Sequence, residues 1–430
     1  MEALSTAPEG AGGTLGPGTS RPRRGTCRFC GTPLSHVFAD LGATPLANSY
    51  LTEAEVSGAE RYYPLCALVC DQCLLVQLEE YEAPETIFGD YAYFSSFSTS
   101  WLEHSRRYAE MAIERFGLGP ESRVVEVASN DGYLLRWFRE RQIPVLGIEP
   151  AENVARVAIE HEIPTLVEFF GVETARRLAP EWSADLLIGN NVLAHVPDLN
   201  DFVGGLAILL KPGAALTLEF PHLLQLIEHR QFDTIYHEHF SYFSFATVRR
   251  VFAQHGLEVH DVDELPTHGG SLRIYAARAD AQPPALSDRA AALLERERAA
   301  GLDQLDTYLA FQESVRAAKR DLLDFLVTLK RDGLRLAGYG APAKGNTLLN
   351  YCGIGSDFLE FTVDVSHHKQ GLYLPGTRIP VRSPDAIREA RPDVVLILPW
   401  NLRDEITAQH AYVGEWGGRF AVPAPEPALL

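Results

Sequence analysis

The sequence lacks several features that would place the chain in whole classes of protein. No run of apolar residues is long enough to span a bilayer, and the start of the chain has neither the basic residues nor the apolar stretch of a secretory signal. Basic residues are in the minority, with 38 Lys and Arg against 57 Asp and Glu and a formal net charge of −19. This charge argues against nucleic acid as a partner, because neutralising phosphates requires a basic surface.

Cysteine is scarce as well. Six cysteines in 430 residues do not make a disulfide scaffold, so a reducing cytoplasm is the expected location. The apolar fraction of 46% and the charged fraction of 22% are those of an ordinary soluble protein. We expect a monomer or homodimer with no membrane partner.

The chain is too long for one comfortable core and predicts an α/β protein of several domains. Its first residues are rich in Gly, Ala, Ser, Thr and Pro, which is typical of a disordered tail. The predicted divisions are a disordered tail over 1–24, a zinc-binding module over 25–90, a Rossmann-like domain over 91–285, a helical connector over 286–330 and a second Rossmann-like domain over 331–430.

Four of the cysteines form two C-x-x-C pairs, Cys27 with Cys30 and Cys70 with Cys73. Such a pair places two thiolates at the mouth of a tight turn, and two pairs complete a tetrahedral zinc site. With four protein ligands no position is left open for catalysis, so the zinc is expected to be structural. A redox dithiol is the less favoured alternative.

A strand, a small-residue turn and a helix open the central region in the sequence RVVEVASNDGYLLRWF from Arg123 to Phe138. This unit cradles phosphates or a cofactor in doubly wound sheets, although its turn lacks the G-x-G-x-x-G that close approach to a dinucleotide requires. Glu149 ends the next strand, where an acid accepts hydrogen bonds from the ribose of an adenosine cofactor. A surface acid at a strand end is the alternative. By sequence order Asp131, Glu149, Asn191 and His195 fall at the carboxyl edge of one sheet.

The densest polar and aromatic cluster of the chain is YHEHFSYFSF, from Tyr236 to Phe245. A carboxylate flanked by two imidazoles predicts a proton-transfer device, because histidine titrates near neutral pH and a nearby acid tunes it. An aromatic turn whose histidines only satisfy buried hydrogen bonds is the alternative.

The C-terminal region contains another strand, glycine turn and helix in RLAGYGAPAKGNTLLN, from Arg335 to Asn350. Its helix N-terminus suits a diphosphate, and Lys344 would add positive charge there. The glycines fit only a relaxed dinucleotide fingerprint, so a plain strand-to-helix turn is the alternative.

These motifs together resemble a known family. The stretches E-V-A-S-N-D-G, I-E-P and L-K-P-G are similar to class I S-adenosylmethionine-dependent methyltransferases, although Ala128 and Asn130 stand where glycines are usual. With the cysteine pairs, N-V-L-A-H-V and Y-H-E-H-F-S-Y-F-S, the chain resembles the nucleotide-deoxysugar C-methyltransferases of antibiotic sugar pathways. The resemblance covers nearly everything after residue 24. That family methylates a carbon beside a 4-keto group.

The resemblance implies a central class I methyltransferase domain that methylates C3 of a TDP-linked 4-keto-deoxysugar through an enolate, with C5 left open. It implies His239 as the base, Glu238 as its orienting or tuning partner and Tyr236 at the keto oxygen or in a proton relay, with His195 and Tyr91 in the same pocket. The expected S-adenosylmethionine-binding residues are Glu126, Ser129, Asn130, Asp131, Gly132, Glu149, Pro150, Asn153 and Asn191. The expected substrate-binding residues are His237, Tyr93, Gly340, Lys344 and Asn346.

Two other functions stay open from the sequence. One is an NAD-dependent nucleotide-sugar oxidoreductase or epimerase that uses the C-terminal glycine turn. The other is a zinc-knuckle binding protein with an inactive methyltransferase domain.

Overall fold

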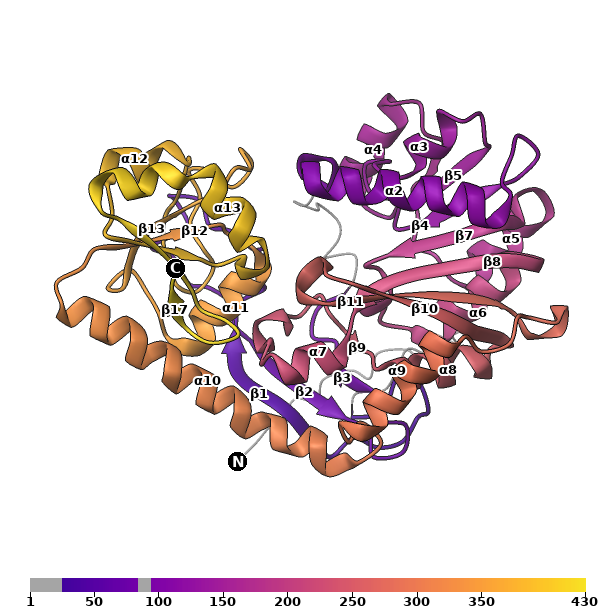
Figure 1. Ribbon diagram of the computed structural model, residues 1–430, viewed down its shortest axis with the longest axis horizontal. Helices are drawn as coiled ribbons and strands as arrows, with labels where there is room; N and C mark the ends of the chain where they lie inside the picture. The colour runs from indigo at the N-terminus through magenta and orange to yellow at the C-terminus, as the bar shows by residue number, and fades with distance from the viewer. Residues whose placement is uncertain (1–24, 84–93) are drawn as a thin grey trace, which may run out of the picture.

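The computed structural model describes residues 25–83 and 94–430, which form three β-sheets and the helices packed around them (Figure 1). A small N-terminal sheet module, a central doubly wound sheet and a C-terminal Rossmann-like sheet follow one another as predicted. The tail predicted over 1–24 lies outside the described residues. Within the described ranges, no helix combines the length and the apolar character that crossing a membrane requires.

The central sheet has seven strands in the order β6-β5-β4-β7-β8-β11-β10. Its strands are β4 (Val124–Val127), β5 (Val145–Ile148), β6 (Thr165–Leu166), β7 (Ala184–Asn190), β8 (Leu210–Pro221), β10 (Leu257–Leu265) and β11 (Ser271–Arg278). The strands from β6 to β8 are parallel, and β11 pairs with β8 in the antiparallel direction. The strand order reverses between β4 and β7, and ligands of open α/β sheets bind at the carboxyl ends of such strands.

Helices cover both faces of this sheet (Figure 1). On one face, Tyr108 of α2 and Phe138 of α3 belong to one buried cluster, and on the other Phe202 of α6 and Phe252 of α8 belong to a second. The helices are α2 (Thr99–Phe116), α3 (Leu135–Arg139), α4 (Glu152–Glu160), α5 (Val172–Trp182), α6 (Leu199–Leu209), α7 (Leu223–Glu228) and α8 (Phe245–Gln254).

Strands β10 and β11 form an antiparallel hairpin at the edge of the central sheet. Its tip, His268 to Gly270, has positive φ at all three residues. A Cβ atom on Gly269 would lie 2.5 Å from Cη2 of Trp400, so only glycine allows the tip to pack against the C-terminal part of the chain.

The N-terminal sheet combines residues from two distant parts of the sequence. Its order is β1 (His36–Thr44), β2 (Tyr63–Val69), β3 (Val76–Leu78) and β9 (Ser241–Tyr242), all antiparallel. Strand β9 begins two residues after His239, so pairing with β3 fixes the chain directly behind the predicted proton-transfer cluster. Leu75 beside the cysteines packs with Phe243 and Phe245 in the core of the central region.

The C-terminal sheet has the order β14-β13-β12-β15-β16-β17, parallel except for its last strand. Its strands are β12 (Leu336–Tyr339), β13 (Leu359–Val363), β14 (Val381–Arg382), β15 (Val394–Ile397), β16 (Arg419–Val422) and β17 (Ala428–Leu429), with helices α11 (Ala343–Cys352), α12 (Asp385–Ala390) and α13 (Arg403–Gln409). Here the order reverses between β12 and β15, so the glycine turn after β12 stands at a second switch point.

Two helices connect the central and C-terminal sheets, as the helical periodicity of 286–330 predicts. They are α9 (Asp288–Ala299) and α10 (Leu305–Arg331), and the 27 residues of α10 extend along the base of the molecule (Figure 1). Phe311 of α10 stacks on Phe38 of β1, with ring centroids 4.5 Å apart. One buried cluster therefore includes the N-terminal sheet, α10 and the C-terminal sheet.

Glu297 of α9 holds the chain on both sides of the proton-transfer cluster. It accepts hydrogen bonds from the backbone N–H groups of Phe245 at 2.6 Å and Ala246 at 2.9 Å, which are donors left open at the start of α8. The same carboxylate pairs with Nε2 of His222 at 2.7 Å, and both side chains are at most 2% exposed. His222 follows β8, so one buried acid joins β8, α8 and α9.

Glu297→Ala should destabilise the protein by about 3–5 kcal/mol, because it leaves His222 and two backbone N–H groups buried without their acceptor. Denaturant unfolding followed by tryptophan fluorescence measures the change. Glu295→Ala is the matched control on the same helix, since Glu295 is exposed and pairs with Arg298, its neighbour one turn along. Equal unfolding midpoints for the two variants would contradict the role given to Glu297.

Candidate active site

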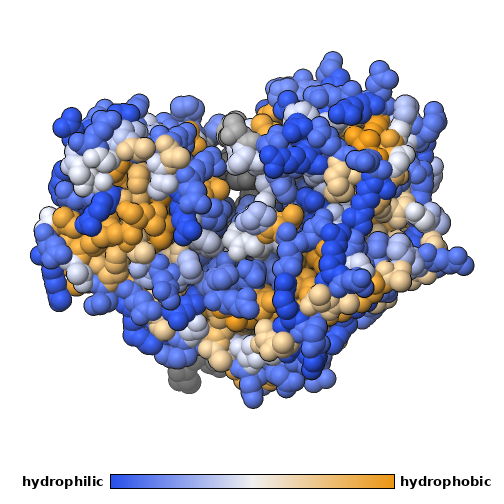
Figure 2. Space-filling model, in the orientation of Figure 1, coloured by the Kyte–Doolittle hydropathy of each residue, from blue (hydrophilic) through white to orange (hydrophobic). Residues whose placement is uncertain are grey.

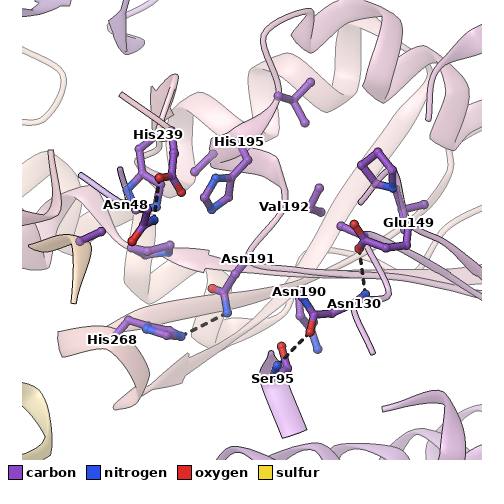
Figure 3. Close-up of a pocket in the computed structure, with 18 of the residues that line it drawn as sticks. Asn48, Ser95, Asn130, Glu149, Asn190, Asn191, Val192, His195, His239 and His268 are labelled. Atoms are coloured by element: carbon purple, nitrogen blue, oxygen red, sulfur yellow. Dashed lines mark hydrogen bonds between the residues drawn. The ribbon is translucent and has the colours of Figure 1, made fainter. Parts of the chain in front are cut away.

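A cavity of about 370 Å³ lies where the three sheets meet. Figure 2 shows a hollow between the C-terminal lobe on the left and the central sheet's lobe on the right. In Figure 3, His239 and His195 lie on one side of this pocket and Glu149 and Asn130 on the other. The cavity is lined by side chains from the turn after β4, the ends of β5 and β7, the tetrad of Tyr236 to His239, and the turn before α11.

The turn after β4 has the backbone shape of a glycine-rich turn without the glycines. Ala128 and Asn130 take φ values of 56° and 51°, in the left-handed region that favours glycine. The Asn130 side chain makes a structural hydrogen bond, because its Oδ1 accepts the N–H of Ser95 at 2.8 Å. Asp131 accepts the N–H of Ser96 in the same way at 3.0 Å. These contacts hold the start of the segment before α2 against the turn.

Glu149 faces the cavity from the end of β5. Its two carboxylate oxygens accept the backbone N–H groups of Asn130 and Ala151, each at 2.9 Å (Figure 3). Burial raises the pKa of Glu149, and these two hydrogen bonds oppose that rise. The acid is therefore held in one orientation while it retains lone pairs for a ligand.

The other cofactor candidates divide into two groups. Pro150 and Asn191 line the cavity together with Asn130 and Glu149. The remaining ones do not line it, and they are Glu126, Ser129, Asp131, Gly132 and Asn153. Glu126 is fully buried, and burial raises its pKa well above the usual range against the hydrogen bond from Tyr133.

The end of β7 contributes two amides. Within the part of the chain that the structure describes, the buried Nδ2 and Oδ1 atoms of Asn190 have no hydrogen-bond partner. Asn191 has a φ of 53°, and its Nδ2 lies 3.2 Å from Nε2 of His268 (Figure 3). Asn190 lines the cavity, so its amide is available to a polar ligand.

A turn, and not a helix, brings Tyr236 and His239 together. The N–H of His239 donates to the carbonyl of Tyr236 at 2.8 Å, which closes a turn and leaves the two rings 4.0 Å apart. Both side chains line the cavity.

His239 is fixed as a neutral ring with a defined acceptor atom. Its Nδ1 lies 2.8 Å from the carbonyl oxygen of Thr234, and a carbonyl can only accept, so Nδ1 carries the proton. The lone pair of the neutral ring is therefore on Nε2. Burial lowers the pKa of His239 well below its usual value. Electrostatic repulsion between the protonated forms of His239 and His195, whose ring centroids are 4.7 Å apart, lowers it further.

Two more histidines complete this side of the cavity. Burial lowers the pKa of His195 to about 4, against a hydrogen bond to the backbone of Glu238. Burial also lowers the pKa of His268 to about 4. All three imidazoles are therefore neutral near pH 7.

Glu238 is the acid of the tetrad and is buried in the cavity wall. Asn48, from the loop between β1 and β2, donates its Nδ2 hydrogen to Oε1 of Glu238 at 2.6 Å. Burial raises the pKa of Glu238 to about 7, while Asn48 and the charge of Lys369 lower it. The carboxyl group is thus close to half ionised at neutral pH.

His237 points away from the cavity, so its assignment to the substrate site is not supported. Its Nε2 lies 3.1 Å from the carbonyl oxygen of Pro64, and its ring packs edge-on against Tyr63 and Tyr81. Successive residues of the turn point in different directions, which the sequence pattern YHEH does not reveal. Tyr91 and Tyr93, the other aromatic candidates, lie outside the described residues.

The C-terminal part supplies Lys344 and Lys369 to the cavity. The ammonium group of Lys344 donates to Oδ1 of Asn401 at 2.8 Å and lies 4.6 Å from the centre of the Trp400 ring. Burial lowers the pKa of Lys344, and the charge of Asp233 opposes this.

Two other substrate candidates have structural roles in place of the predicted one. The Nδ2 atom of Asn346 donates to the carbonyl of Ala47 at 2.6 Å, and Asn346 is 1% exposed and outside the cavity lining. Gly340 has a φ of 88°, and a Cβ there would lie 2.5 Å from Cδ of Pro399. The glycine is therefore required by the tight strand-to-helix turn itself.

Several lining residues were not found from the sequence, namely Asn48, Trp101, Glu168, Phe169, Asn190, His268 and Lys369. Glu168 and Phe169 follow the two-residue strand β6, which is too short to show a pattern. The position of Asn190 at the end of a predicted strand was a usable signal. The others reach the cavity through contacts between distant segments.

The four predicted cysteines form one cluster. Their sulfur atoms all lie within 4.8 Å of one another, with Cys27 to Cys73 and Cys30 to Cys70 each at 3.5 Å. Four ligands at about 2.3 Å around a tetrahedral zinc ion are about 3.8 Å apart, so the cluster fits zinc after a small expansion. Gln77 donates to the sulfur of Cys27 at 3.2 Å, which favours its thiolate form.

Models of three protein families match successive parts of the chain. Residues 27–88 match "Putative zinc binding domain", residues 101–262 match "Methyltransferase domain" and residues 266–425 match "C-methyltransferase C-terminal domain". The three matches together span the described sheets in order.

Similar proteins include "C-methyltransferase NovU" of Streptomyces niveus, which is 38% identical over 411 residues, 94% of this chain and 96% of that protein. "Ubiquinone biosynthesis O-methyltransferase" of Rhodopseudomonas palustris (strain BisA53) is 26% identical over 29% of this chain and 58% of that protein. Among solved structures, magnesium protoporphyrin IX methyltransferase (ChlM) from Synechocystis PCC 6803 with bound SAM is 14% identical over 47% of this chain and 100% of that chain, with a TM-score of 0.34. This TM-score is too low to support a conclusion about this chain.

Cys70→Ser should abolish zinc binding, because three ligands cannot complete the tetrahedral site. Elemental analysis should find about one zinc per wild-type chain and none in the variant, with a melting temperature lower by about 10 °C or more. Cys66→Ser is the control, since Cys66 lies outside the cluster and burial raises the pKa of its thiol to about 11. Full zinc content in Cys70→Ser would disprove this ligand set.

Proposed function

Because the chain belongs to the C-methyltransferase family, we propose that this S-adenosylmethionine-dependent enzyme methylates C3 of a TDP-linked 4-keto-deoxysugar, with His239 as the base. One observation supports this reaction above the others. A neutral histidine whose Nε2 lone pair is defined lines the same cavity as the strand-end acid Glu149 and two lysines.

The cavity has groups suited to each part of the methyl donor. Glu149 would hold the ribose hydroxyls, Phe169 offers a ring face for the purine, and Asn190 and Asn130 offer amides to the amino-acid end. When bound, S-adenosylmethionine supplies an electrophilic methyl group on a sulfonium ion. The lining residues fit this cofactor because the apolar side chains of Ile148, Val192 and Phe170 line the cavity together with these polar groups.

His239 can remove a proton from carbon because the ring is neutral and held still. A 4-keto group acidifies the adjacent C3–H bond, and Nε2 of His239 accepts that proton while Nδ1 keeps its bond to Thr234. The positive charge that develops on the ring has no protonated histidine beside it, since the pKa of His195 and of His268 is lowered to about 4 in each case.

The enolate oxygen requires a donor that is already in place. Tyr236 packs on the His239 ring and lines the same cavity, so its phenol is the proposed donor or proton relay at C4. Glu238 is the proposed tuning acid, because its carboxylate stabilises positive charge in this part of the wall.

The nucleotide diphosphate is assigned to the C-terminal side of the cavity. Lys344 and Lys369 both come from that side, and within the described ranges no acid lies within salt-bridge distance of Lys344. An ammonium group without an acid partner attracts phosphate strongly. In a chain with a net charge of −19, this local charge is needed to bind an anionic substrate.

The oxidoreductase alternative depended on the glycine turn at Gly340. Packing of Pro399 against this turn accounts for the glycine without a nicotinamide cofactor. Membership of the methyltransferase family favours methyl transfer instead. The deciding experiment for the proposed substrate incubates the protein with S-adenosylmethionine and a panel of nucleotide 4-keto sugars, followed by mass spectrometry and NMR. A methyl group found only on oxygen or nitrogen would reject the proposal.

His239→Asn should lower the methyl-transfer rate about 10²- to 10⁴-fold, because a positioned base contributes that much. The variant should still bind S-adenosylmethionine by calorimetry, yet lose deuterium wash-in at C3 of the sugar. His237→Asn is the matched control, since that ring faces Pro64, and it should keep the exchange. Unchanged exchange in His239→Asn would remove His239 from the role of base.

Glu149→Gln should weaken S-adenosylmethionine binding roughly 10- to 100-fold, because the ribose loses a charged acceptor. Isothermal titration calorimetry measures the affinity, and circular dichroism checks the fold. Glu152→Gln is the control, since Glu152 is an exposed acid three residues away at the start of α4. Equal affinities in the two variants would place the ribose elsewhere.

A further inference from the structure

Asn48 brings the N-terminal module into the active-site cavity. It lies in the loop between β1 and β2, far in sequence from the other lining residues, and its Nδ2 is 2.6 Å from Oε1 of Glu238 (Figure 3). An amide N–H can only donate, so this contact favours the ionised carboxylate over the neutral acid.

The loop around Asn48 is fastened to the C-terminal part on both sides. Before Asn48, the carbonyl of Ala47 accepts Nδ2 of buried Asn346 at 2.6 Å. After it, the hydroxyl of Tyr50 donates to the carbonyl of Ala341 at 2.5 Å, and Leu51 forms a β-bridge with Tyr373. These contacts with the C-terminal part therefore hold the loop that places Asn48 against Glu238.

The groups that face Glu238 come from three parts of the chain. Asn48 and the buried phenol Tyr50 lie on the N-terminal loop, and Lys369 lies on the C-terminal side, 3.9 Å from Asp364 and 5.4 Å from the centre of the Tyr50 ring. From the central region, His195 bonds to the backbone of Glu238. Asn48 makes the direct hydrogen bond to the carboxylate, and Lys369 acts through its charge.

We propose that Asn48 is a positioning residue that favours the ionised form of Glu238, so that the N-terminal module controls the proton-transfer state of the active site. The catalytic consequence rests on the proposed function, in which the Glu238 carboxylate stabilises the His239 ring as it gains a proton. The hydrogen bond itself does not depend on that function. The two can therefore be tested separately.

The first test measures methyl transfer as a function of pH. Burial raises the pKa of Glu238 and the Asn48 donor lowers it, so Asn48→Ala should raise it. The acidic limb of the rate profile should move to higher pH by about one to two units, with wild-type rates recovered at alkaline pH. Asn48→Asp should move it further, because it places a second acid beside the first. Ser49→Ala, an exposed neighbour, is the control and should leave the profile unchanged.

A role for Asn48 in loop packing alone would lower the rate by the same factor at every pH. Such a uniform loss, or an acidic limb that does not move, would overturn the proposal. The Glu238→Gln variant should lack this limb, and adding Asn48→Ala to it should produce no further shift of the profile.

The second test needs no substrate. Infrared difference spectra between the wild type and Glu238→Gln, recorded across pH, report the protonated carboxyl band of Glu238 directly. Its midpoint should rise in Asn48→Ala and stay in place in Ser49→Ala. An unchanged midpoint overturns the proposal even if the enzyme methylates the expected sugar. A raised midpoint supports it even if the substrate proves to be a different one.

Discussion

Removal of ionisable groups from water is the constraint on which the cavity depends. His195, His239 and His268 are packed within one wall, and burial lowers the pKa of each of them. His195 and His239, with ring centroids 4.7 Å apart, cannot both be charged at low cost in such a place, so protonation of one ring opposes protonation of the other. The carbonyl of Thr234 then orients one of the rings by accepting its Nδ1 hydrogen. The rest of the fold surrounds this wall with segments from all three sheets.

That enclosure requires all three sheets. The central sheet alone leaves the carboxyl ends of β4 and β7 open to solvent, as open α/β sheets do. The N-terminal sheet covers one side by pairing β3 with β9, which immediately follows the tetrad. The C-terminal sheet covers the other side with the turn before α11, which lines the cavity. Leu75, two residues after Cys73, belongs to one buried core with Phe243 and Phe245, so the cysteine-containing module packs against the segment that follows the tetrad.

The sequence was sufficient to predict residue positions where a local pattern determines the structure. Strand ends predict the carboxyl edge of a parallel sheet, so Glu149, Asn191 and His195 were placed correctly beside one cavity. The cysteine spacing likewise predicted the cluster. The sequence was insufficient where two segments distant in the chain must meet. Asn48 lies 190 residues from Glu238, and no periodicity or spacing links them.

Motif positions were a poor guide to binding residues where the packing of the backbone, and not a ligand, determines the residue type. Gly340 and Asn346 were expected to bind the substrate, yet Gly340 fits beside Pro399 and Asn346 holds the carbonyl of Ala47. Only Lys344 of that group faces the cavity.

The position of Lys344 also explains how an acidic protein can bind an anion at this point. Among the described residues no carboxylate lies within salt-bridge distance of its ammonium group. Asp233, the acid whose charge acts on Lys344, accepts a hydrogen bond at Oδ2 from Nε1 of Trp400 at 2.7 Å. Lys369, by contrast, lies between Asp364 and the Glu238 side of the cavity. The two lysines thus have different electrostatic surroundings. The one without an acid partner is suited to an incoming phosphate, and the other is suited to keeping Glu238 ionised.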